Sequence, residues 1–195
     1  MPDDASEDES SQFAAASLWA DRFDASLRSE SARAKVILSA CYLDELLRQL
    51  IALALAPAEV RDDPLLDGPQ APLGTFSAKI DLCVRMALIP VETGKSLHLV
   101  RRIRNRFAHD LASCDFSDSK ILGWSVDLHN LNDHATPERR SSFTEGALGD
   151  FEKSVSWLVF WLKHLVDSTP SSCPKCGTEM AHRAKIKALK PGDGT

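Results

Sequence analysis

The sequence predicts an all-α protein, a helical bundle of about five main helices followed by a short cysteine-containing C-terminal tail. Apolar residues recur at three- and four-residue steps along several long stretches, which is the period of an amphipathic helix. No alternating strand pattern and no internal repeat stands out in the 195 residues. With 44% hydrophobic residues, the chain can bury one sizeable core, so a single main domain is expected.

The clearest helical pattern lies between Val36 and Ala54, and Pro57 follows where the helix should end. The stretch "RDDPLLDGPQAPLG" then predicts a loop, because it holds three prolines and two glycines. Residues 110–135 are polar and irregular, with room for a short helix in "SKILGWSVDLH". The main helices are expected at residues 12–28, 30–56, about 75–88, about 91–109 and about 137–167.

We expect three parts along the chain. Residues 1–10 hold five acidic residues and almost nothing to bury, which predicts a disordered acidic tail. Residues 11–169 form the helical domain. Residues 170–195 form a basic tail with a Cys-x-x-Cys motif.

Charge and cysteine content restrict the classes of partner and compartment. The formal net charge of −5 means that contact with nucleic acid would need a local basic patch. The N-terminus does not resemble a signal peptide, and no apolar stretch is long enough to span a bilayer. The five cysteines do not form a disulfide framework, so a reducing compartment fits. We therefore expect a cytoplasmic protein with no membrane contact.

The most unusual stretch is "LVRRIRNRFAHD", residues 99–110, where cations crowd into one and a half helical turns before His109. In a straight helix Arg104 and His109 point away from each other by more than a right angle. They converge only if the helix loosens near His109 or if a second subunit supplies one of them. A solvated cationic face near a helix C-terminus is the alternative. The crowded residues are Arg101, Arg102, Arg104, Asn105 and Arg106.

A family resemblance rests on this stretch and on two others. "RNRFAH" resembles the R-N-x-x-x-H form of the motif of HEPN domains, which are all-α domains and in many cases metal-independent ribonucleases. The wider sequence is similar to the mannitol operon repressor (MltR) family. The stretches that carry this similarity are "SARAKVILSACYLDELLRQLI" (31–51), "PLGTFSAKIDLCVRMALI" (72–89) and "LVRRIRNRFAHD" (99–110).

The HEPN resemblance implies RNA cleavage by attack of a ribose 2′-OH on the adjacent phosphate, with no cofactor for catalysis. His109 suits proton transfer near neutral pH. Arg104 suits the charge that builds up on phosphorus, and Asn105 would orient the phosphate or His109. The resemblance also implies a homodimer that pairs two such helices. Phosphate contacts in RNA are expected from Arg101, Arg102 and Arg106.

Two functions remain open at this stage. The first is a metal-independent endoribonuclease, a toxin or stress effector with an antitoxin or regulatory protein as partner. The second is a non-enzymatic, MltR-like transcriptional regulator that acts through protein contacts. The sequence has no helix-turn-helix with a base-reading helix, so direct binding to an operator is not supported.

Two further stretches carry candidate ligand-binding groups. Thr75, Ser77 and Lys79 lie at a predicted helix start, where an anion can bind, although a turn with an N-cap is the favoured interpretation. Arg33 and Asp44 or Glu45, on an otherwise apolar helix, are interpreted as surface or ion-paired residues.

The tail motif "CPKCG" resembles half of a zinc knuckle. Cys173, Cys176 and His182 are spaced to bind one structural zinc ion, which would take its fourth ligand from elsewhere or from a second tail in a dimer. A redox motif is less suited to this context, because a thioredoxin-type site needs a βαβ unit. A tail with two free thiols is the alternative.

Overall fold

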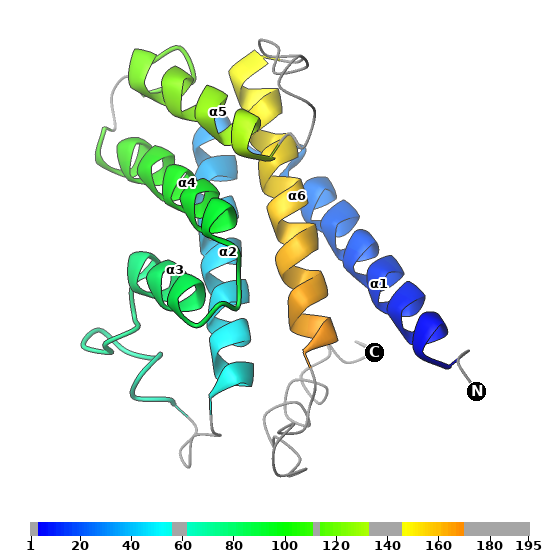
Figure 1. Cartoon of the computed structure of the whole chain (residues 1–195). Helices are drawn as coiled ribbons and strands as arrows, with labels where there is room; N and C mark the ends of the chain where they lie inside the picture. Colours follow the sequence, from blue (N-terminus) through cyan, green and yellow to red (C-terminus); the bar gives the residue numbers. More distant parts are fainter. Residues whose placement is uncertain (1–3, 56–61, 111–113, 133–145, 170–195) are drawn as a thin grey trace, which may run out of the picture.

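The computed structural model describes residues 4–55, 62–110, 114–132 and 146–169, and all regular structure within these ranges is helical. It confirms the predicted all-α class (Figure 1). The six helices in the described ranges are α1 (Asp4–Leu27), α2 (Ala32–Ala54), α3 (Phe76–Arg85), α4 (Val91–His109), α5 (Ser119–Asn132) and α6 (Gly146–Ser168). None of these helices is long and apolar enough to cross a lipid bilayer.

Two long helices, α2 and α6, form the centre of the bundle. α2 packs against α3, α4 and α6, whereas α6 packs against α1, α2 and α5. In Figure 1, α1 lies on the outer side of α6, and α3 and α4 lie on the opposite side of the bundle. The fully buried side chains that join these layers include Leu43, Leu47, Ile103, Phe107 and Leu158.

Three of the helices are capped at their N-terminus by a polar side chain. Ser31 and Thr75 each accept a hydrogen bond from the backbone N–H three residues later, at 3.2 Å in both cases. Asp118 accepts from the N–H groups of Lys120 and Ile121, at 2.9 and 3.2 Å. These bonds satisfy donors that the first helical turn leaves without a partner.

The ends of several helices differ from the sequence-based expectation. α4 spans the predicted residues, and α2 agrees within two residues. α1 begins at Asp4, eight residues earlier than expected, inside the stretch that the composition assigned to a disordered tail. The polar stretch after α4 holds a full helix of 14 residues, α5. The expected start of the last helix near Pro137, and the tail 170–195, lie outside the described residues.

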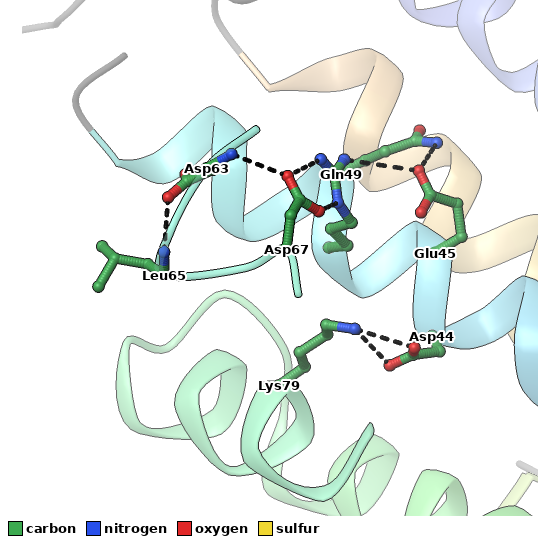
Figure 2. A network of polar contacts seen from close by, with 8 residues as sticks. Asp44, Glu45, Gln49, Asp63, Leu65, Asp67 and Lys79 are labelled. Atoms are coloured by element: carbon green, nitrogen blue, oxygen red, sulfur yellow. Dashed lines mark hydrogen bonds and ion pairs between the residues drawn. The ribbon is translucent and has the colours of Figure 1, made fainter. Parts of the chain in front are cut away.

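Two ion pairs attach α3 and the loop before it to α2 (Figure 2). Arg48 donates from Nε and Nη2 to the two carboxylate oxygens of Asp67, at 2.7 and 2.8 Å. Lys79, which is almost fully buried, donates from Nζ to both carboxylate oxygens of Asp44 at 2.9 Å. The Arg48 hydrogen bonds lower the pKa of Asp67. Charged side chains of α2 therefore hold a loop whose sequence predicts no regular structure.

Candidate functional site

Apolar anchors fix the "RNRFAH" stretch in the last turns of α4. Ile103 and Phe107 are buried in the core, and the Phe107 ring lies 5.3 Å from the ring of Phe116, centroid to centroid. Truncating a phenylalanine buried at this level to alanine typically costs about 3–5 kcal/mol of stability. These anchors set the rotation of α4, so the polar residues between them lie on its other faces.

The C-terminal end of α4 is held from α2 by Arg33. Its guanidinium donates to the backbone carbonyl of Phe107 and, at 2.8 Å, to that of Asp110. The last carbonyls of a helix have no partner within the helix. A fixed cation at this end donates hydrogen bonds to them and interacts favourably with the negative end of the helix dipole. Sequence analysis assigned Arg33 to the surface or to an ion pair, and missed this contact because the partners are 74 and 77 residues away in the chain.

The three predicted catalytic residues do not converge within one chain. Arg104 donates from Nη1 to Oδ1 of its neighbour Asn105 at 2.9 Å, and both side chains are half-buried. His109 is exposed at the last position of α4. Because α4 continues as an α-helix to His109, Arg104 and His109 leave the helix axis about 140° apart. The structure thus brings Arg104 to Asn105 but not to His109.

Arg106, predicted to contact phosphate, is paired with carboxylates of its own chain. Its Nη2 lies 2.9 Å from Oδ2 of Asp118 and 3.6 Å from Oδ2 of Asp110. The hydrogen bond from Arg106 lowers the pKa of Asp118, and the same bond raises the pKa of Arg106. Since Asp118 also caps α5, Arg106 joins the end of α4 to the start of α5.

Arg101 and Arg102 lie at a different place, in a groove of about 650 Å³ between α4 and α5. The two helices are antiparallel here: Arg106 of α4 meets Asp118 before α5, and Ser96 near the start of α4 donates to Asn132 at the end of α5, at 3.0 Å. We call this feature the α4–α5 groove. Its lining residues are Lys95, His98, Leu99, Arg101 and Arg102 of α4, and Asp127, Asn130 and Leu131 of α5.

Four charged residues that line the α4–α5 groove make no ion pair in the part of the chain that the structure describes. Within the described ranges, Lys95, Arg101 and Arg102 make no ion pair, and Asp127 on the facing helix makes none either. The Nε atom of Arg101 and the Nδ1 atom of His98 are covered and have no hydrogen-bond partner in this part of the chain.

His98 is oriented by Asp81 of α3, whose Oδ1 lies 3.1 Å from Nε2 of His98. Three of the other described lysines, in contrast, form ion pairs: Lys35, Lys79 and Lys163 each contact a carboxylate of the same chain. The groove therefore presents charge that the fold itself does not use.

Sequence reasoning identified two arginines of the groove but not its other charged residues. Helical spacing alone would have placed Lys95, His98 and Arg102 on one face of α4, since they lie three, four and seven residues apart. Asp127 and Asn130 had no comparable signal, because the polar stretch that forms α5 lacks a clear apolar period.

The structure also places the other candidate ligand groups. Lys79 is bound to Asp44, and Thr75 caps α3 at the backbone of Ala78, so the turn with an N-cap is the interpretation that these contacts support. The cysteines of the described ranges are free thiols. No group of three metal-binding side chains occurs in those ranges, and the predicted zinc ligands Cys173, Cys176 and His182 lie outside them.

No protein-family model and no curated protein matches the chain. Among solved structures, the chain is similar to a chain of the MtlR–HPr complex from Escherichia coli, known from an X-ray structure. The alignment covers 78% of this chain and 98% of that chain, with 21% sequence identity and a TM-score of 0.49. No activity or partner follows from a likeness of this size, and the MltR and HEPN resemblances stay predictions.

Proposed function

We propose that the protein is a non-enzymatic regulator that acts through protein contacts, and that the α4–α5 groove binds an acidic segment of its partner. The observation that carries this proposal is the set of unpaired cations, Lys95, Arg101 and Arg102, along one wall of the groove. Unpaired charge on a surface steers a partner of opposite charge and selects against partners of the same charge.

The composition of the groove favours a protein segment over an RNA backbone. Asp127 and Asn130 can accept hydrogen bonds from the backbone or side chains of a peptide. Leu131, which is half-buried, supplies apolar contact, which a phosphodiester backbone does not use.

The test compares Arg102→Glu with Arg85→Glu, a matched charge reversal at an exposed residue of α3 outside the groove. The tagged full-length chain is recovered from its native cells, and co-purified proteins are quantified by mass spectrometry. We expect one or more partners that Arg102→Glu loses by about tenfold or more, as for a central charge in an interface, and that Arg85→Glu retains. Equal recovery with both variants, or recovery only of nuclease-sensitive RNA, would reject the proposal.

Metal-independent RNA cleavage is the second candidate, favoured by the exposed imidazole of His109 and by the Arg104–Asn105 hydrogen bond on the same helix. It requires a second subunit, because one chain does not join Arg104 to His109. Incubation with total RNA in EDTA tests it directly. Cleavage that His109→Ala and Arg104→Ala each reduce by about 100- to 10,000-fold, with unchanged circular dichroism, would establish the enzyme. Intact RNA with the wild-type protein would exclude it for the RNAs tested.

A further inference from the structure

His98 connects the contact between α3 and α4 with the α4–α5 groove. α4 lies between α3 and α5 (Figure 1). The Nε2 atom of His98 lies 3.1 Å from Oδ1 of Asp81 on α3, and the same side chain lines the groove. The side chain is 29% exposed, while its Nδ1 atom is covered and has no hydrogen-bond partner among the described residues. One imidazole thus joins a fixed contact to the surface that we assign to the partner protein.

The contact with Asp81 determines which nitrogen of the neutral imidazole carries the proton. Near neutral pH a carboxylate only accepts hydrogen bonds, so Nε2 of His98 donates to Oδ1 of Asp81. A neutral imidazole holds a single N–H, which leaves Nδ1 as an acceptor. A second proton at Nδ1 makes the ring a cation and keeps the hydrogen bond to Asp81. His98 can therefore gain a charge without losing the contact that orients it.

The charged groups around His98 come from all three helices. They are Asp81 and Arg85 of α3, Lys95, Arg101 and Arg102 of α4, and Asp127 of α5. Lys95 and Arg102 lie three and four residues from His98, so the three side chains are neighbours on the surface of α4. A carboxylate of the partner that pairs with either cation therefore lies close to the imidazole. A negative charge within about 4–6 Å of an imidazole favours the protonated ring.

We infer that His98 takes up a proton at Nδ1 when an acidic segment of the partner occupies the α4–α5 groove. This inference rests on the proposed function, because it uses the same groove, and it adds regulation by pH. The affinity gained from the proton is complete where the free ring is already charged, and it is lost as the pH rises through the range in which the bound ring titrates. Histidine titrates in the range of about pH 5 to 8, so the partner binds more tightly at about pH 6 than at about pH 8.

Isothermal titration calorimetry with the full-length chain tests the inference. The probe is an acetylated and amidated pentapeptide of four aspartates around a central leucine, because aspartate stays ionised throughout this pH range. The same peptide with asparagines in place of the aspartates is the control for charge. We expect the binding constant of the acidic peptide to fall about tenfold from about pH 6 to about pH 8. Titrations near pH 7 in two buffers of different ionisation enthalpy should show that binding takes up protons.

Two histidine variants assign the proton to its residue. His98→Gln removes the titrating ring and keeps an N–H donor for Asp81, so its affinity for the acidic peptide should be the same at both pH values. His129→Gln is the matched control, since His129 is a half-buried histidine of α5 outside the groove, and it should keep the pH dependence of the wild type. Long-range proton–nitrogen NMR spectra of the free protein at about pH 8 should find the proton of the His98 ring on Nε2.

The outcomes separate this inference from the proposed function. An acidic peptide that binds equally at both pH values, or whose pH dependence survives His98→Gln, overturns the proton uptake and leaves the groove as a site for acidic segments. A neutral His98 ring with its proton on Nδ1 overturns it as well. If the wild-type protein does not bind the acidic peptide at either pH value, or binds both peptides equally, the inference and the proposed function are both rejected.

Discussion

Removing the carboxylate of Asp44 should destabilise the protein much more than removing that of its neighbour Glu45. Asp44→Ala leaves the ammonium group of Lys79 inside the bundle without its partner, and the Lys79 side chain is only 5% exposed. Breaking a fully buried pair in this way costs about 3–5 kcal/mol. Asp44 is 30% exposed, so water can reach part of the pair, and we expect a loss of about 2–3 kcal/mol in the free energy of unfolding.

Urea denaturation followed by circular dichroism measures this loss. Glu45→Ala is the control, since Glu45 is exposed and, among the residues that the structure describes, bonds only to Gln49 and Arg48 on the same helix. This substitution should cost about 0.5 kcal/mol or less. A second variant, Asp44→Leu/Lys79→Met, removes both charges and should recover most of the loss. If Asp44→Ala costs no more than Glu45→Ala, the ammonium group of Lys79 reaches water and the reasoning from burial is wrong.

Three further predictions concern packing, acid stability and thiol reactivity. Gly94→Ala should destabilise the protein by about 1–2 kcal/mol, because the added Cβ would lie 2.5 Å from Cγ2 of Val84 on α3. Gly123→Ala should stabilise it by up to about 1 kcal/mol, because the added Cβ meets open space on a helix. Thermal unfolding of the two variants compares these effects. Asp67 has a lowered pKa, so its contribution to stability is complete above its ordinary value of 3.8 and is lost as the pH falls through its folded-state value. Urea midpoints between pH 5 and about pH 2 should therefore decline less steeply in Asp67→Asn than in the wild type. Burial raises the pKa of Cys83 to about 12, so at pH 8 a thiol reagent should label the exposed Cys41 and spare Cys83 until the protein unfolds, as peptide mass spectrometry can show.

The sequence predicts the bounds of some helices and not of others, for reasons that differ from helix to helix. The bounds of α4 were predictable because Pro90 stops the preceding turn and the basic run ends at His109. For α5 the sequence predicted no more than a short helix. Leu122 and Val126 are exposed apolar residues, so the apolar positions of α5 do not follow its buried face. Composition did not reveal the early start of α1, because a run of acidic residues occurs both in disordered tails and in helices.

The candidate site was predictable as a set of residues on one helix, but not as a geometry. Sequence alone treated Arg101, Arg102 and Arg106 as one group of phosphate ligands. The structure divides them, because Asp118 pairs with Arg106 while the other two line a groove. That division depends on the antiparallel docking of α5, a tertiary contact that no local pattern in residues 99–110 encodes.

The contact of Arg33 with the end of α4 makes the position of His109 a tertiary property. The N–H of Asp110 closes the last turn on the carbonyl of Arg106 at 3.1 Å, and the guanidinium from α2 satisfies carbonyls beyond that turn. A peptide of residues 91–109 would fray at this end, because it lacks that cation. We therefore expect the start of α2 and the end of α4 to open together in the protein, so the amide hydrogens of both should exchange with solvent at a common rate. The position of this histidine thus depends on a contact between two segments that lie more than 70 residues apart in the chain.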